Sequence, residues 1–222
     1  AKEDYYFHKE TVLPNLVWNP GKTYLTSGIY LSKSIFEYGE GWGSSTSSNH
    51  NITINTPYNY NNNIPADCEV RLCSTSGMQS LQIKVSHQIM YTFAFSGDTV
   101  MNHNFNISPA QINSSTNLSI NGNNGAYDKH IIAYVSITYP RLFNFEGKSE
   151  FKFNIKASTT KKYIEVSNFS NPGNFQNVYL YDLTNKERIQ CFWDPVNSKV
   201  LFELNPSAAD RELILISYGD SD

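Results

Sequence analysis

Three aromatic residues, Trp42, Tyr58 and Tyr60, are the side chains best suited to bind a ligand, because they lie in glycine- and asparagine-rich segments. Trp42 stands between Gly41 and Gly43, and glycine lets a backbone approach a ligand closely. Aromatic faces beside amide donors and acceptors suit sugars. The sequence therefore predicts Trp42, Tyr58 and Tyr60 as ligand-binding residues. In the competing interpretation Trp42 anchors the core and the tyrosines cover its rim.

Patterns for catalysis, metal binding and cofactor binding are missing from the sequence. The five histidines show no H-x-x-x-H spacing and the cysteines no C-x-x-C spacing, so a transition-metal site is not expected. No G-x-S-x-G, G-x-x-x-x-G-K-[ST] or G-x-G-x-x-G motif occurs. We expect no catalytic residue, no metal and no cofactor in this chain. A cysteine–histidine pair stays open, although all three cysteines fall within strand patterns.

The three cysteines, Cys68, Cys73 and Cys191, do not form a disulfide framework, because an odd number cannot pair within one chain. Cys68 and Cys73 fall in one predicted strand, where a rise of about 3.3 Å per residue separates them by roughly 16 Å. A disulfide requires Cα atoms within about 7 Å of each other. We expect three buried thiols, and the pairing of Cys68 or Cys73 with Cys191 stays open.

The charge and hydropathy of the chain exclude several classes of partner. The net charge is −3 and charged residues make up 17% of the 222 residues, so no basic surface points to nucleic acid. No segment approaches the roughly 20 apolar residues that span a bilayer as a helix. We therefore expect neither a nucleic-acid partner nor a membrane span.

The composition and periodicity predict an all-β fold. Asn occurs 26 times and Ser 25 times, and aromatic residues reach 14%, which indicates aromatic strands joined by polar turns. Short alternating segments are predicted as strands at residues 51–55, 67–76, 81–85, 89–95, 117–121, 130–139, 151–156, 163–166, 178–182, 189–193, 199–204 and 212–218. This spacing is typical of a jelly-roll, galactose-binding-like β-sandwich followed by a smaller antiparallel β-module.

Three regions follow from this pattern. Residues 1–37 are predicted as an irregular N-terminal segment with one or two short strands, and residues 36–48 as a loop around Trp42. Residues 38–158 are predicted as the jelly roll. After a polar run at residues 158–162 the strand pattern restarts, and residues 159–222 are predicted as a small immunoglobulin-like or β-sheet module.

Four stretches form an ordered set of motifs: residues 36–43 (FEYGEGWG), 68–76 (CEVRLCSTS) with 81–85, 133–141 (AYVSITYPR) with 151–153 (FKF), and 163–169 (YIEVSNF) through 178–185 (VYLYDLTN). In this order they resemble the β-rich region that precedes the peptidase domain of gingipain-type cysteine peptidases and their PorU-like relatives of Bacteroidetes, which include the type IX secretion signal peptidase. The resemblance covers roughly residues 36–190.

The resemblance implies a non-catalytic accessory region of an exported gingipain-like peptidase. Its partner would be the peptidase domain of the same parent chain or a protein substrate, and the fragment itself would not be an enzyme. It also implies a location in the cell envelope, on the outer-membrane surface or outside the cell. The abrupt start at Ala1 is consistent with a piece of a longer, processed protein. A carbohydrate-binding or adhesion jelly roll using Trp42, Tyr58 and Tyr60 remains the alternative, with a glycan as partner.

Overall fold

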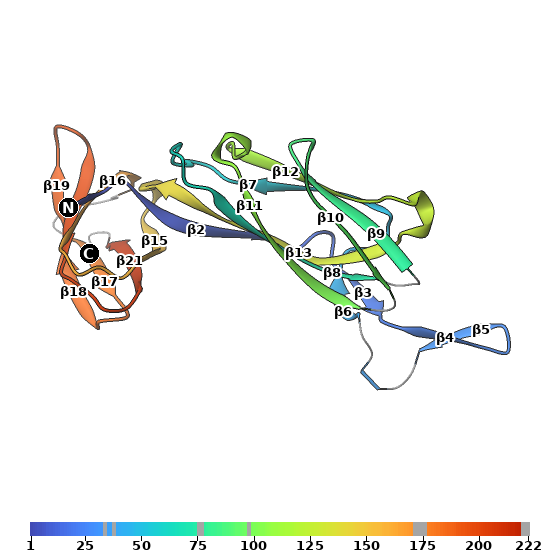
Figure 1. Cartoon of the computed structure of the whole chain (residues 1–222). Coiled ribbons are helices and arrows are strands. Elements are labelled where there is room, and N and C mark those ends of the chain that lie inside the picture. The colour runs from blue at the N-terminus through green and yellow to red at the C-terminus, as the bar shows by residue number, and fades with distance from the viewer. Residues whose placement is uncertain (33–34, 37–38, 75–77, 97–98, 171–176, 219–222) are drawn as a thin grey trace. The chain divides into compact units, whose positions relative to one another are not determined.

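The computed structural model describes residues 1–32, 35–36, 39–74, 78–96, 99–170 and 177–218, and most of them lie in β-strands (Figure 1). Two short 3₁₀ turns, η1 (Pro109–Gln111) and η2 (Gly125–Tyr127), interrupt the strands. Among these residues no helix has the length and apolarity to cross a membrane. The all-β prediction is confirmed. Residues 37–38 and 75–76 of the motifs above lie outside the described residues.

The chain folds as two compact units. Unit 1 contains Ala1–His8, Tyr58–Tyr60 and Pro140–Asp222, and unit 2 contains Lys9–Pro57 and Asn61–Tyr139. Strands β2 (Tyr5–Val12) and β13 (His130–Leu142) therefore contribute residues to both units.

Unit 2 is built on a jelly roll of eight strands. Between β2 and β13 these are β7 (Asn49–Asn55), β8 (Ala66–Ser74), β9 (Met78–Val85), β10 (Gln88–Ser96), β11 (Val100–Ile107) and β12 (Ser115–Gly122). Strand β2 pairs with β13, β7 with β12, β8 with β11 and β9 with β10, so the pairs are nested from the outermost to the innermost. The strands form two sheets, with the orders β10-β9-β12-β7 and β11-β8-β13-β2. This nested pairing is the jelly-roll topology that the sequence predicts.

Alternating side chains make each sheet two-faced. In β7, Ile52 and Ile54 are buried while Asn51 and Thr53 are exposed. Successive side chains of a strand point to opposite faces, so one face of each sheet supplies the core and the other is polar. The two inner faces share one hydrophobic cluster that includes Val70, Leu81, Ile120 and Ile137.

The N-terminal part of unit 2 contains more strands than the sequence predicts. Strand β3 (Val17–Pro20) pairs with β6 (Glu40–Gly43), which lies inside the segment predicted as a loop. Between them, β4 (Thr23–Thr26) and β5 (Ile29–Ser32) form a hairpin. Ser27 and Gly28 have φ of 52° and 81°, as a type I′ turn requires. The loop prediction is wrong for residues 40–43, because their partner residues lie 20 or more positions away in the sequence.

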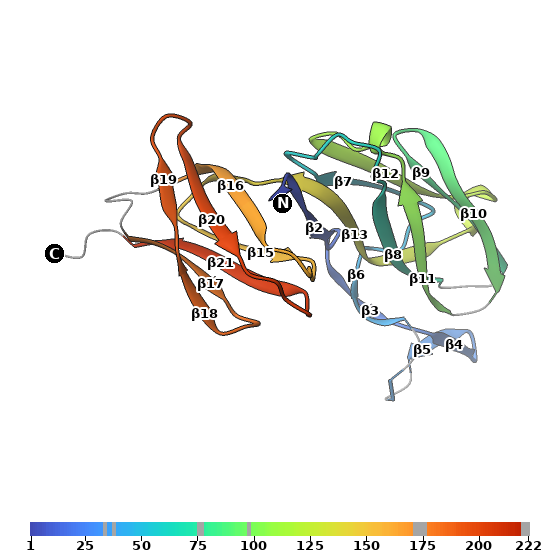
Figure 2. The ribbon, with the colours of Figure 1, turned by 60° about the vertical axis from the view of Figure 1, so that its left-hand side comes forward.

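Unit 1 contains two further sheets (Figure 2). One has the order β1-β16-β20-β19, with β14 also paired to β16, and the other has the order β15-β21-β17-β18. Their bounds are β1 (Lys2–Glu3), β14 (Asn144–Lys148), β15 (Glu150–Ile155), β16 (Lys162–Phe169), β17 (Val178–Asp182), β18 (Glu187–Gln190), β19 (Phe192–Asp194), β20 (Lys199–Leu204) and β21 (Arg211–Ser217). An aromatic-rich core that includes Phe145, Phe153 and Phe202 fills this unit.

Two details of unit 1 differ from the sequence prediction. The pairs β1–β16 and β14–β16 are parallel, so the module is not purely antiparallel. The predicted boundary at residues 158–159 also differs from the observed division at Pro140, because β14 and β15 pair with β16 and β21 of the C-terminal sheets.

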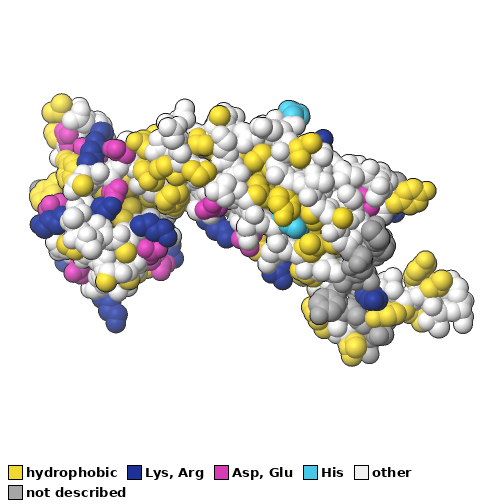
Figure 3. All heavy atoms as spheres, in the orientation of Figure 1, with side chains coloured by type: hydrophobic (Ala, Val, Ile, Leu, Met, Phe, Trp, Pro, Cys, Tyr) yellow, Lys and Arg dark blue, Asp and Glu magenta, His cyan; other side chains and the backbone are white. Residues whose placement is uncertain are grey.

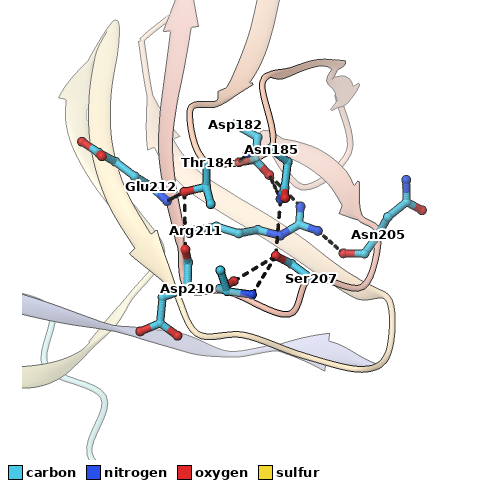
Figure 4. Close-up of polar contacts among 9 residues, drawn as sticks. Asp182, Thr184, Asn185, Asn205, Ser207, Asp210, Arg211 and Glu212 are labelled. Atoms are coloured by element: carbon cyan, nitrogen blue, oxygen red, sulfur yellow. Dashed lines mark hydrogen bonds and ion pairs between the residues drawn. The ribbon is translucent and has the colours of Figure 1, made fainter.

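A buried ion pair fixes the turn after β17 (Figure 4). Arg211 Nη1 donates to Asp182 Oδ2 at 2.8 Å, and both side chains are almost fully buried. The Asp182 carboxylate also accepts the backbone N–H and the side-chain amide of Asn185, each at 2.9 Å. A second guanidinium nitrogen of Arg211 donates to the carbonyl of Asn205. The D-L-T-N part of the last family motif is therefore a structural turn.

Candidate functional site

Two tryptophans stand side by side on the surface of unit 2. Trp18 of β3 pairs with Trp42 of β6 across the two strands, and their ring centroids lie 5.8 Å apart in an edge-to-face arrangement. Trp42 is 63% exposed and Trp18 is 53% exposed. The interpretation in which Trp42 anchors the core is therefore wrong.

The glycines around Trp42 serve the packing of β6 more than access by a ligand. A Cβ atom on Gly39 would lie 2.5 Å from Cys73 Sγ, and one on Gly43 would lie 2.8 Å from a methyl group of Ile131. These two glycines let the backbone approach the sandwich itself. Gly41 differs, since no described atom lies within 4 Å of the Cβ position there. Only Gly41 leaves room for a ligand.

Beside Trp42 the surface of unit 2 is hollowed. The hollow has a volume of about 420 Å³ and is lined on one side by Trp42, Phe36 and Glu40, and on the other by outward-facing residues of β8 and β13 that include Arg71 and Ile131. Such a mainly apolar hollow with a few polar groups is the usual form of a small-ligand or peptide site.

Tyr58 and Tyr60 belong to unit 1, whereas Trp42 belongs to unit 2. The Tyr58 ring lies 5.5 Å from the guanidinium carbon of the buried Arg141, and the Tyr60 ring stacks on Tyr5 with centroids 5.0 Å apart. The structure therefore gives both tyrosines packing partners within unit 1. A ligand-binding role for Trp42, Tyr58 and Tyr60 stays a prediction.

The segment from β3 to β6 carries many exposed apolar side chains, which we call the apolar arm: Trp18, Leu25, Ile29, Tyr30, Leu31, Ile35, Phe36 and Trp42. Figure 3 shows hydrophobic side chains on the β4–β5 hairpin, and within the described residues β4 and β5 pair only with each other. An isolated two-stranded hairpin is marginally stable in water. The run Ile29-Tyr30-Leu31 after a Ser-Gly turn is the sequence signal of this hairpin, but the prediction of an irregular N-terminal segment does not include an exposed apolar surface.

Burial disfavours the reactive thiolate form of the three cysteines. Cys68, Cys73 and Cys191 are buried thiols, as the sequence predicts, and burial raises the pKa of Cys68 and of Cys191 to about 12. A neutral buried thiol is a poor nucleophile. No group of three or more His, Cys, Asp or Glu side chains that could hold a metal occurs in the described part of the chain.

Two histidines of unit 2 pack against each other. The rings of His50 and His130 lie 4.8 Å apart, and His50 Nε2 donates to the His130 carbonyl at 3.1 Å. Desolvation by burial lowers the pKa of His130 to about 4 and also lowers the pKa of His50. Both rings are therefore neutral near pH 7, and they link the start of β13 to β7.

Comparisons with known proteins give a likeness of fold and none of sequence. No protein-family model matches the chain, and no curated protein matches it. Dimeric latent PorU from Porphyromonas gingivalis matches with a TM-score of 0.60 at 7% identity, over 97% of this chain and 20% of the PorU chain.

Carbohydrate-binding modules match less closely. The CBM36-1 domain of a xylanase from the hindgut metagenome of Trinervitermes trinervoides has a TM-score of 0.34 at 12% identity, over 59% of this chain and 95% of that domain. The CBM6 of the laminarinase LamC from Zobellia galactanivorans has a TM-score of 0.32 at 11% identity, over 60% and 98%.

The PorU comparison establishes a shared fold over nearly the whole described chain, in agreement with the resemblance of the sequence motifs. This chain spans about a fifth of the PorU chain. At 7% identity the likeness shows the fold alone, and the chain is thus an all-β protein of two units with a PorU-like fold.

Proposed function

We propose that this chain is a non-catalytic interaction module of an exported gingipain-like cysteine peptidase, in which it positions the peptidase domain or its protein substrate. The apolar arm is the observation that carries this proposal, because a group of exposed apolar side chains marks an interaction surface that a protein partner would cover. The PorU-like fold supports the choice of parent protein. The cell envelope, the outer-membrane surface or the extracellular space is the corresponding location.

The size of the apolar arm suits a protein partner. Trp18, Tyr30, Phe36 and Trp42 are between 53% and 78% exposed. An aromatic side chain covers roughly 150–250 Å², so these four alone offer on the order of 500 Å². Four aliphatic side chains add to this area, and one side of a standard protein interface is about 800 Å². Tyrosine, tryptophan and phenylalanine are also enriched in the cores of protein interfaces.

Site-specific photo-crosslinking tests this proposal. We expect p-benzoylphenylalanine in place of Tyr30, introduced into the complete gene product in its own cells, to crosslink to a peptidase domain or its protein substrate. Mass spectrometry identifies the crosslinked peptide. Tyr127 is the matched control, since this tyrosine is 86% exposed and lies in η2, outside the apolar arm. Equal yields at the two positions, or crosslinks to polysaccharide alone, would contradict the proposal.

Glycan binding at Trp42 is the second candidate function. The specific observation in its favour is the exposed Trp18–Trp42 pair beside the hollow, because an exposed indole face can stack on a sugar ring. Trp42→Ala tests it cleanly, since a side chain this exposed contributes little to the core. If the variant keeps both its stability and all of its glycan affinity in a pull-down on insoluble polysaccharide, this function of Trp42 is excluded.

A further inference from the structure

The outward face of the sheet β11-β8-β13 carries three rows of polar residues in register. Each row joins an exposed asparagine of β11 to a charged residue of β8 and a hydroxyl-bearing residue of β13. We call this set the polar ladder, and its rows are Asn102-Arg71-Tyr134, Asn104-Glu69-Ser136 and Asn106-Asp67-Thr138.

Hydrogen bonds from Tyr134 of the neighbouring row and from Lys9, outside the ladder, fix Glu69 of the middle row in place. Tyr134 donates its hydroxyl to Glu69 Oε1 at 2.6 Å, and Lys9 Nζ lies 3.1 Å from Glu69 Oε2. The hydrogen bond from Tyr134, followed by that from Lys9, holds the pKa of Glu69 below its ordinary value. Glu69 is therefore a charged acceptor in a fixed position, and a preorganised acceptor costs a ligand little reorganisation.

The ladder is a hollowed track and not a flat face. A hollow of about 280 Å³ lies over the two rows that contain Glu69 and Asp67, and Lys9, Asn104 and Asn106 also line it. Along β8 the same face continues through Arg71 to Cys73, where the hollow beside Trp42 begins. The six steps from Asp67 to Cys73 span about 20 Å. Both hollows therefore lie along one strand face.

The charges of the track select among extended ligands. Lys9 and Arg71 balance Asp67 and Glu69, so the track has no net charge. A track without net charge has no field that attracts a polyanion. The amide groups of the three asparagines each donate and accept hydrogen bonds, and hydroxyl groups do the same. A neutral, polyhydroxylated chain matches this pattern best.

We infer that the polar ladder is a binding site for a neutral glycan chain, which lies along the strands and reaches Trp42 at one end. The ligand is of the same class, a glycan, as in the second candidate function. None of the ladder residues belongs to the apolar arm. Its failure would therefore leave the proposed protein interaction untouched, and the photo-crosslinking experiment would still decide that interaction.

The other sheet of the jelly roll, β10-β9-β12-β7, supplies a matched control position for the test of this inference. A hollow of about 360 Å³ there is lined by Asn51, Thr53, Asn117 and Ser119, which carry amides and hydroxyls but no carboxylate. Asn51 is exposed and sits on β7, as Asn104 is exposed and sits on β11. Replacement of either asparagine by alanine removes the same group from an exposed strand position, so neither variant should lose its fold.

Affinity electrophoresis of the whole chain in gels that contain barley β-glucan, xylan or mannan tests the inference, with heparin as the polyanion. We expect at least one neutral polysaccharide, and not heparin, to retard the chain. We expect Asn104→Ala to weaken this affinity about tenfold, as the loss of two amide hydrogen bonds implies, and Asn51→Ala to leave it unchanged. Glu69→Gln should also weaken it, because the fixed charge is lost.

Three results would overturn the inference. They are the absence of retardation by all three neutral polysaccharides, an affinity of Asn104→Ala equal to that of the parent chain, and a greater loss with Asn51→Ala than with Asn104→Ala. Circular dichroism and urea unfolding of each variant show that the comparison is made between folded proteins.

Discussion

Gly39 is the residue whose replacement should be least tolerated around Trp42. Its φ is +80°, and an added Cβ would overlap Cys73 Sγ. We expect Gly39→Ala to lower the free energy of unfolding by about 1–3 kcal/mol. Gly28→Ala is the matched control, because Gly28 has nearly the same φ of +81° with no described atom within 4 Å of its Cβ position.

Urea unfolding of the two variants separates the two causes. A larger loss for Gly39→Ala than for Gly28→Ala measures the overlap with Cys73, and Cys73→Ala should restore part of it. Equal losses would show that the backbone conformation alone accounts for the effect.

His130 should make unit 2 less stable in mild acid. Because burial lowers its folded pKa to about 4, the unfolded chain binds more protons below about pH 6.5. The free energy of unfolding therefore falls as the pH drops from about 6.5 toward 4, by up to about 3 kcal/mol for this group. His50, whose ring faces His130, acts in the same direction, and the nearby Asp128 carboxylate is bound by Asn124.

Urea unfolding between about pH 7 and pH 5 measures this dependence, above the range in which most carboxylates titrate. His130→Asn should flatten the profile. A profile of His130→Asn as steep as that of the parent chain would show that other groups cause the loss.

At the residue scale the sequence predicts a ligand-binding role for Trp42 but does not predict that Trp18 lies beside it. Trp42 stands out because glycines flank it, whereas Trp18 becomes part of the same surface only through the pairing of β3 with β6. The polar ladder could not be predicted either, since its three rows depend on the register of three strands far apart in the sequence.

Among the elements, the turn after β17 depends on the buried pair Asp182–Arg211. We expect Arg211→Ala to lower the free energy of unfolding by about 3–5 kcal/mol, because it leaves the Asp182 carboxylate buried without its cation. Lys156→Ala is the control, since the Lys156–Asp210 pair is mostly exposed and should change stability by less than about 1 kcal/mol. Chemical denaturation compares them, and similar losses would contradict the assignment.

Strands with strict alternation are the elements that the sequence predicts well. Residues 178–182 and 199–204 coincide with β17 and β20. The sequence does not predict strand β11, because asparagine disfavours strands and three asparagines alternate here with Met101, His103 and Phe105. The outward-facing asparagines of β11 therefore lower its predicted strand propensity, although its inward-facing residues repeat with the usual period of two.

For the whole molecule, two separate cores predict separate local stabilities. Ile54 belongs to the core of unit 2 and Phe202 to that of unit 1, and both are fully or almost fully buried. We expect Ile54→Ala to speed amide hydrogen exchange mainly in β7, β9 and β12, and Phe202→Ala mainly in β16 and β20. Uniform acceleration across the chain by either variant would show instead that the two units unfold as one.

The nested pairing of the jelly roll also orders its assembly in time. Strands β9 and β10 are neighbours in the sequence, whereas β2 and β13 are more than 100 residues apart. Closing a long loop costs more chain entropy than closing a short one, and folds with many distant contacts form slowly. We therefore expect folding to begin at the β9–β10 hairpin and to proceed outward. The N-terminal strand would dock last, so a nascent chain cannot complete this sandwich until β13 has been synthesised.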